Sequence, residues 1–292
     1  MKQYEQALRL AAKRGDTKVV KALLDAGTNP DGRAPGQELP ITIAADKGKT
    51  AIVKALIEAG ADVNADGGDA IEMAARNGHH KVVQLLVDVA DIGGLDHRYV
   101  LLFAVSHPAT FKYLHDAFAE AGYNVDLTTI LHDVLKDEDG ISAAAIKTLV
   151  TAGANINAPD EDGLTPLTMV ASDGDLSTVK LLLKLGASID EKTLPFAAAD
   201  GDNNLETAKE LIKAGATARA DALEAAVESG STAMVKIIKN AIRNRVGEIG
   251  LALRNRMAML ELIEVVKYEI GHDTLTDAEI TKILKKIPAH QP

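Results

Sequence analysis

Hydrophobic residues recur along this chain in short groups that have the spacing of an α-helix. The first two groups are Val19, Val20, Leu23 and Leu24, followed by Ile52, Val53, Leu56 and Ile57. Residues at positions i, i+1, i+4 and i+5 share one face of a helix, so each group predicts an amphipathic helix with a single apolar stripe. Because the pattern returns along most of the chain, we expect an all-α protein.

Each amphipathic helix is expected to end at a glycine, and these glycines are regularly spaced. They are Gly27, Gly60, Gly122, Gly153, Gly186 and Gly215, with Ala90 filling the position between Gly60 and Gly122. The intervals between successive positions are 29 to 33 residues. Glycine adopts, without steric cost, the left-handed conformation that follows the last turn of a helix.

A shorter helix that carries two adjacent small residues is predicted before each amphipathic helix. The pairs are Ala11-Ala12, Ala44-Ala45, Ala74-Ala75, Val170-Ala171 and Ala225-Ala226, and a further glycine follows each pair within a few residues. One such helix–turn–helix unit cannot bury its own apolar stripe, whereas stacked neighbours can. The chain is therefore predicted to be an array of about eight units over residues 1–240.

Several short motifs within this array resemble those of the ankyrin-repeat family. Thr165-Pro-Leu-Thr168 is similar to the family's Thr-Pro-Leu-His, and Gly78-His79 is similar to its Gly-His. The linking motif Gly-Ala-Asp-Val-Asn-Ala is matched by Gly60–Ala65 and, with two changes, by Gly153–Ala158. The resemblance covers residues 5–240 and implies an ankyrin-repeat solenoid of helix-turn-helix units with hairpin loops.

The middle of the chain departs from the regular pattern. The unit at 98–128 contains Pro108, and we expect extra residues between its helices; it also holds six of the nine aromatic residues. The next unit has Lys136–Gly140 inserted at the corresponding place, and the loop at Asp66–Gly68 is shortened. We therefore expect the stacking to change near residues 90–140 and a special surface to lie there.

The segment 241–292 follows the last repeat and is interpreted as a C-terminal helical cap. Residues 241–270 predict one long helix on the spacing of Ile249, Leu253, Met257, Leu260 and Ile263. A capping box, Thr276–Glu279, predicts the start of a second helix that Pro288 would stop. An array needs an end element with a polar outer face. The alternative is a pair of helices that bind a partner or form an oligomer.

Composition restricts the classes of function. The chain lacks cysteine, which excludes disulfides, thiolate zinc sites and cysteine nucleophiles. Its net charge is −10, and residues before 240 hold 24 basic and 35 acidic side chains, a balance that argues against nucleic acid as a partner. A polar N-terminus and the absence of a long apolar run predict a cytoplasmic protein without membrane contact, with signal-independent secretion as an alternative.

No motif for catalysis or for a metal or cofactor stands out. Adjacent residues point away from each other on a helix, so His79 and His80 do not form a metal pair. The acidic loops lack the oxygen spacing of a calcium loop, and no phosphate loop or nucleophile elbow occurs. An enzyme confined to 241–292, with His272, Asp273 and Glu279, is the competing hypothesis, although that segment is too short for its own core.

The resemblance implies that a partner binds the concave groove formed by the first helices and the hairpin tips. The two positions after each small-residue pair are expected to face this groove, namely Lys13, Arg14, Asp46, Lys47, Arg76, Asn77, Ser106, His107, Lys136, Asp137, Ser172, Asp173, Asp200 and Glu228. Basic residues prevail among the early positions and acidic residues among the late ones. This order suggests a groove that attracts a partner of opposite polarity.

We therefore expect a monomeric protein–protein interaction module. A free-standing array of this kind resembles microbial ankyrin proteins that serve as inhibitors, as immunity proteins against toxins or as host-directed effectors. Co-purification with a toxic neighbour would favour the immunity protein, and appearance in host cells would favour the effector. A scaffold that assembles oligomers through the end of the array is a third possibility, tested by the molecular mass in solution.

Overall fold

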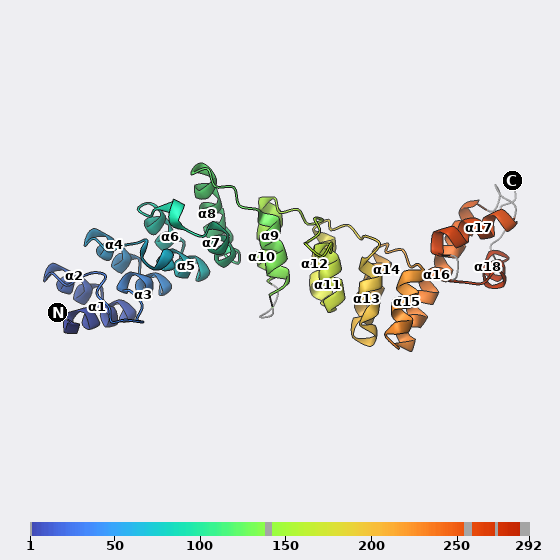
Figure 1. Cartoon of the computed structure of the whole chain (residues 1–292), viewed down its shortest axis with the longest axis horizontal. Coiled ribbons are helices and arrows are strands. Elements are labelled where there is room, and N and C mark those ends of the chain that lie inside the picture. Colours follow the sequence, from blue (N-terminus) through green and yellow to red (C-terminus); the bar gives the residue numbers. More distant parts are fainter. Residues whose placement is uncertain (1, 138–141, 254–258, 272–273, 287–292) are drawn as a thin grey trace. The chain divides into compact units, whose positions relative to one another are not determined.

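The computed structural model of the chain describes residues 2–137, 142–253, 259–271 and 274–286. Throughout these ranges the regular elements are α-helices and short 3-10 helices (Figure 1). Internal contacts divide the chain into two compact units, Met1–Ala154 and Asn155–Pro292, which we describe separately. The all-helical repeat architecture predicted from the sequence is confirmed.

The first unit consists of successive helix pairs joined by short turns. Its helices are α1 (Lys2–Arg14), α2 (Thr17–Asp25), α3 (Pro40–Asp46), α4 (Thr50–Glu58), α5 (Asp69–Arg76), α6 (His80–Val87), α7 (His97–Ala104), α8 (Pro108–Glu120), α9 (Leu127–Leu135) and α10 (Ala143–Ala152), with 3-10 turns η1 (Ala65–Gly67) and η2 (Ile92–Gly94). The first helices of the pairs, α1 to α9 in odd numbers, stack on one another, and the second helices stack alongside them.

The second unit continues the same pattern and then adds further helices. It contains α11 (Pro166–Asp173), α12 (Leu176–Lys184), α13 (Thr193–Ala199), η3 (Gly201–Asn204), α14 (Leu205–Lys213), α15 (Ala220–Glu228), α16 (Thr232–Leu253), α17 (Met259–Ile270) and α18 (Asp277–Leu284). First helices α11, α13 and α15 stack in order, and α17 and α18 both pack against α16.

Small residues allow the first helices to pack closely. Ala44, Ala45, Ala74 and Ala75 are fully buried between neighbouring repeats. The stripe of α4 is buried as predicted, with Ile52, Val53 and Leu56 inaccessible to solvent. In α2 the stripe is only partly covered, since Val19 is 43% exposed. In the described residues α2 packs against α1 and α4, and these contacts leave part of its apolar face exposed.

Glycines after several of the first helices leave room for a side chain of the next repeat, which links the two repeats. Gly48 has φ +64°, and a Cβ there would lie 2.6 Å from the imidazole Nδ1 of His79. The Nε2 of His79 hydrogen-bonds the carbonyl oxygen of Asp46 at 3.0 Å. In the second unit Asn204 does the same with its Nδ2, which donates to the carbonyl oxygen of Ser172 at 2.8 Å beside Gly174.

The middle of the chain is irregular, as expected, but the irregular positions are not all where the sequence predicted them. The turn between α7 and α8 is residues 105–107, the same length as the turn 77–79 between α5 and α6, so the extra residues expected there are absent. The added length lies in α8, which has 13 residues and begins with Pro108, a residue whose fixed φ suits the first helical position. The connection between α9 and α10, at 136–142, is longer, and 138–141 lie outside the described residues.

The C-terminal segment also differs from its prediction. In place of one helix over 241–270, α16 runs from Thr232 through residue 240 to Leu253, and α17 is a separate helix. Met257 and Pro288 lie outside the described residues. The capping box at Thr276 and Glu279 is present, and Gly271 follows α17 with φ +93°. Because α16 begins as the partner of α15, no helix ends at residue 240, and the division of the chain there stays a prediction.

Candidate protein-binding surface

The predicted groove residues lie at the ends of the first helices and in the turns that follow them. Most of these side chains are exposed; Asp46, His107 and Ser172 are half-buried. Asp46 and Lys47 form an ion pair at 2.7 Å, and Asn77 donates from Nδ2 to Asp46 at 3.1 Å. The hydrogen bond to Asp46 raises the pKa of Lys47. The structure thus joins three predicted residues from α3, α5 and their turns into one polar group.

Three acidic residues of the second unit, Asp200, Asp202 and Glu228, differ in their surroundings. Asp202, in η3, accepts a hydrogen bond from the hydroxyl of Ser231 in the next repeat. Asp200 and Glu228 are exposed at the ends of α13 and α15. The 3-10 turn η3 lies between α13 and α14, and its Asp202 is engaged in this internal contact.

His107 contacts the preceding repeat in the same way as His79. It is the residue before α8, and its Nε2 hydrogen-bonds the carbonyl oxygen of Arg76 at 3.0 Å. Its ring lies where a Cβ on Gly78 would be. The repeat spacing predicts that His107 faces the groove beside Ser106, whereas in the structure it joins two repeats.

A cluster of Arg76, Tyr99 and Phe103, which we call the aromatic cluster, lies on the first helices α5 and α7. The guanidinium Cζ of Arg76 is 4.1 Å from the centroid of the Phe103 ring. The rings of Tyr99 and Phe103 are 6.1 Å apart and tilted by 52°. Tyr99 is 53% exposed and Phe103 is half-buried. A cation over an aromatic face is attracted by the ring quadrupole, so the cluster is an ordered group at the surface.

Of the three residues in the cluster, only Arg76 was predicted from the sequence as a site residue. Tyr99 and Phe103 stand four residues apart, and the intervening Val100 and Leu101 are buried. Residues at i and i+4 share one helix face. An aromatic pair at that spacing, on the face opposite the buried stripe, was the signal that could have identified them.

An ion pair lies beside the aromatic cluster on α7. Arg98, beside Tyr99, donates from Nε to Asp133 of α9 at 3.0 Å, and the hydrogen bond raises the pKa of Arg98. Both side chains are partly exposed, so the pair adds little to stability. The pair links α7 to α9 at a position next to the exposed Tyr99.

The hairpin tips are linked from one repeat to the next by side-chain acceptors. Asn64 accepts a hydrogen bond from the backbone N–H of Asp91 at 2.8 Å, and Asn157 accepts one from Ser188 at 2.8 Å. These asparagines occupy the fifth position of the two linking motifs seen in the sequence. Asp31 similarly accepts from the N–H of Asp62 at 3.1 Å. The loops at the edge of the surface are thereby fixed relative to their neighbours.

We also searched the described part of the chain for a metal site and for a membrane-spanning helix. No group of three or more potential metal-ligating side chains occurs among the residues with described positions. His79 is engaged with Asp46, whereas the ring of His80 meets Tyr113 edge-on at 5.7 Å. Of the helices that the structure describes, none has both the length and the apolar character needed to cross a bilayer.

These observations define the class of protein: a helical repeat protein whose first helices carry an ordered polar and aromatic surface. The family model described as "Ankyrin repeats (3 copies)" matches residues 8–96 and 101–193, more than half of the chain. The chain belongs to the ankyrin-repeat family. Ankyrin repeats are generally protein–protein interaction modules and typically non-catalytic scaffolds.

One curated protein similar to the chain is a probable E3 ubiquitin-protein ligase, XBOS32, from Oryza sativa subsp. japonica. It is 31% identical over 129 residues, which are 44% of this chain. The match spans only 19% of the length of that protein.

Solved ankyrin repeat domains also resemble the chain. That of human ASB11 has 25% identity and a TM-score of 0.49, covering 63% of this chain and 84% of its own. A domain from Acinetobacter baumannii AYE has 29% identity and a TM-score of 0.46, covering 62% of this chain and 98% of its own. The ankyrin repeat domain of Bcl-3, of the IkappaB protein family, has 22% identity and a TM-score of 0.46, covering 62% and 86%.

Proposed function

We propose that this chain is a non-catalytic module that binds another protein through the first-helix face of its first unit. The observation that carries the proposal is the aromatic cluster, in which exposed Tyr99 lies beside Phe103 and the stacked Arg76. Tyrosine and arginine are enriched among the residues that dominate protein interfaces. Tyrosine also offers a large contact area with few rotatable bonds, so little entropy is lost on binding.

The order of the surrounding surface supports the same proposal. The Arg98–Asp133 contact and the hydrogen bonds between hairpin tips fix the groups on either side of the cluster before a partner arrives. A binding surface that is already ordered loses less conformational freedom on association.

Charge gives the proposed partner a chemical character. The predicted positions of the first unit are mainly basic, with Lys13, Arg14, Lys47 and Arg76, while the second unit presents Asp173, Asp200 and Glu228. We propose a protein partner that meets the first unit with acidic side chains and the second with basic ones. Such complementarity mainly raises the association rate and the selectivity. The net acidic chain makes nucleic acid a poor partner.

The proposed surface would serve an inhibitor, an immunity protein or an effector equally well. We propose that the unbound protein is a monomer that exposes its binding face. Binding, and not turnover of a substrate, is the proposed activity in every case.

Affinity capture with matched variants tests the proposal. The immobilised parent, Tyr99→Ala and Tyr268→Ala are exposed to an extract of the native source, and the retained proteins are compared by quantitative mass spectrometry. Tyr268 lies on α17 and is 80% exposed, so its substitution is a matched control. We expect a protein retained by the parent and the control to be lost from Tyr99→Ala, because truncation of an anchor costs about 2 kcal/mol or more. Equal retention by all three would contradict the proposal.

A further inference from the structure

Two of the C-terminal helices, α16 and α18, carry a group of exposed basic side chains. This group, which we call the basic patch, consists of Lys236, Lys239 and Arg243 of α16 with Lys282 of α18 and Lys286 of the turn that follows it. The three residues of α16 stand three and four positions apart, so they share one helix face over a length of about 10 Å. The whole chain has a net charge of −10, so the patch is opposite in sign to the rest of the protein.

The packing of α18 on α16 brings the two parts of the basic patch together. Glu279, in the first turn of α18, lies close to the basic residues of α16. Its pKa is lowered first by hydrogen bonds with Thr276 and further by the positive charges of Arg243 and Lys239. Lys282 stands three residues after Glu279 and therefore shares its helix face. The lysines of α18 thus extend the basic face of α16.

The positive charge of the basic patch is not neutralised by ion pairs among the residues that the structure describes. The one carboxylate shown beside it, that of Glu279, accepts hydrogen bonds from the N–H and the hydroxyl of Thr276 at 3.0 and 2.9 Å. The exposed lysines of α14 differ, because Lys209 and Lys213 are each paired with a glutamate of their own helix, at 2.5 and 3.6 Å. The patch is therefore free to attract an anion from solution.

Helix stability does not explain the basic residues of α16. Cations stabilise a helix in its last turn, where the carbonyl groups point outward. Lys236, Lys239 and Arg243 lie far from the end of this 22-residue helix, so the helix dipole gives them no stabilising role. Lys282 and Lys286, at the end of α18, do gain from the dipole. The part of the patch on α16 is thus the part that needs another explanation.

The surroundings of the basic patch favour a narrow anion over an extended one. Glu248 of α16 and Asp277 of α18 are 68% and 66% exposed, so a membrane surface or a nucleic acid would meet these carboxylates as well as the patch. The neighbouring apolar residues Ile242 and Ile280 are fully buried and offer no side chain that could enter a bilayer. A short acidic peptide segment contacts the patch alone.

We propose that the basic patch binds a short acidic segment of a partner protein, in which several carboxylates follow one another closely. Carboxylates on one side of an extended segment are about 7 Å apart, so two of them fit the row on α16 and further ones reach α18. Each contact between exposed charges is weak, so binding requires several of them together. The basic patch and the aromatic cluster lie on different helices, so this inference does not depend on the proposed function and can fail separately.

Titration of the full-length protein with a hexaglutamate peptide at low salt, followed by ¹H–¹⁵N NMR, tests the proposal. We expect saturable shifts at the amides of Lys239, Arg243 and Lys282 at millimolar peptide, and binding that is at least about tenfold weaker in about 0.5 M salt because of screening. Hexaglutamine is the matched neutral peptide, and we expect it to leave these amides unshifted. Equal binding of the two peptides, or no saturable shift at these amides, would overturn the proposal.

Two double variants locate the site without removing core residues. We expect Lys239→Gln combined with Arg243→Gln to weaken hexaglutamate binding at least about tenfold, because two charge contacts are lost. Lys209→Gln combined with Lys213→Gln removes the same charge from α14, where the lysines are already paired, and is expected to bind as the parent does. If the first variant, folded by circular dichroism, binds hexaglutamate unchanged, the basic patch is not the site.

The same amides distinguish an acidic segment from other anions. Vesicles of phosphatidylcholine with phosphatidylserine supply an anionic membrane, and a short double-stranded DNA supplies a nucleic acid. At a matched concentration of negative charge, we expect hexaglutamate to shift the amides of the basic patch more than either of them. Stronger binding of the vesicles or of the DNA to the patch would show that the proposed occupant is wrong.

Discussion

At the scale of single residues, Asp190 shows how one carboxylate organises a repeat of the second unit. It accepts hydrogen bonds from the hydroxyls of Thr165, Thr168 and Thr193 at 2.9, 3.1 and 2.8 Å. Burial is the largest influence on its pKa and raises it, yet the three hydroxyls and the backbone N–H of Thr193 together lower it below 3.8. Because Thr168 and Thr193 are fully buried, their hydroxyls depend on this acceptor.

The sign of this pKa shift predicts a pH dependence of stability. A carboxyl whose folded-state pKa is lowered stabilises the fold above its unfolded-state value of 3.8 and loses that contribution as the pH falls through the folded value. We expect Asp190→Asn to lower the free energy of unfolding by about 1–3 kcal/mol at pH 7, since it disturbs buried hydrogen bonds. The difference from the parent should shrink below about pH 3.8. Urea unfolding at pH 7 and pH 3 measures both, and a difference independent of pH would be inconsistent with this account.

Substitution of two glycines can distinguish the cost of backbone strain from the cost of a lost contact between repeats. Gly48 and Gly60 both have positive φ, +64° and +83°, but only Gly48 faces a neighbour, the imidazole of His79. Alanine at either position is strained, by about 1–3 kcal/mol. We expect Gly48→Ala to lose a further 1–3 kcal/mol or so through overpacking, measured by urea unfolding against Gly60→Ala as the control. The double variant Gly48→Ala, His79→Ala should recover part of that excess, and equal losses for the two glycine variants would refute the contact.

At the scale of helices, α16 serves two roles at once. Its first turns pair with α15, and its later part carries Val246 and Ile249, which are buried where α17 and α18 pack. The apolar side chains of α17 and α18 that face inward include Val266, Ile270, Ile280 and Leu284. We propose, as the sequence suggested, that these helices cap the array, because they cover apolar surface that an uncapped repeat would expose to water.

Removal of α17 and α18 tests the proposed cap. A chain that ends after residue 253 should expose the apolar face of α16, and we expect it to associate or aggregate, because large exposed apolar patches drive association. Light scattering coupled to size-exclusion chromatography compares the masses of the truncated and full-length proteins. A truncated protein that remains a stable monomer would show that the two helices have another role, such as binding a partner.

The helices show which parts of the fold a sequence can specify. Glycines at the ends of helices and paired alanines between them repeat with one period, so the array was predictable from local rules. The length of α8 was not, because Pro108 is acceptable both in a turn and as a first helical residue, and only packing of Phe111 and Phe118 decides between them. The continuity of α16 was predictable, since no glycine or proline marks residue 240; the boundary was drawn there because the repeat pattern stops, although the helix continues.

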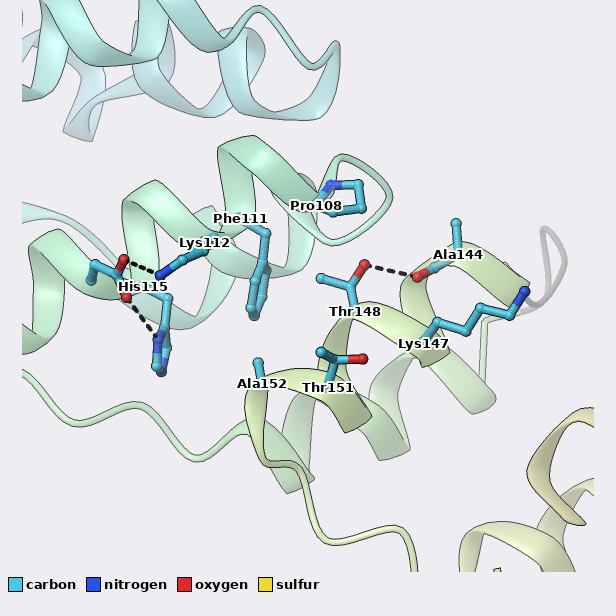
Figure 2. Close-up of a pocket in the computed structure, with 10 residues that line it drawn as sticks. Pro108, Phe111, Lys112, His115, Ala144, Lys147, Thr148, Thr151 and Ala152 are labelled. Carbon is cyan, nitrogen blue, oxygen red and sulfur yellow. Dashed lines mark hydrogen bonds and ion pairs between the residues drawn. The ribbon is translucent and has the colours of Figure 1, made fainter. Parts of the chain in front are cut away.

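The candidate site was predictable to a smaller extent. Exposed positions come directly after the paired alanines in each repeat, so the repeat spacing alone predicts that Lys13, Arg14 and Lys47 are exposed. The stacking of Arg76 on Phe103 joins residues 27 positions apart and depends on how α5 packs on α7. Likewise, a cavity of about 720 Å³ between α8 and α10 depends on side chains from two repeats (Figure 2), and no spacing within one repeat reveals it.

At the scale of the whole molecule, charge is expected to guide association. The chain has 42 acidic and 32 basic side chains, and the predicted binding positions of the first and second units differ in sign. We expect Asp173→Lys combined with Glu228→Lys to slow association with a captured partner while leaving its dissociation rate nearly unchanged. Stopped-flow binding at low and high salt measures this effect, and salt should slow the parent similarly by screening. Association rates that respond to neither change would exclude steering by these residues.

The central claim is that a partner protein contacts the face on which Tyr99 lies, and site-specific photo-crosslinking in the native source tests it most directly. Benzoylphenylalanine replaces Tyr99 in one variant and Tyr268 in the matched control, and both are irradiated in intact cells. We expect a discrete protein adduct from position 99 that is absent from position 268. No adduct from position 99, or the same adducts from both positions, would contradict it.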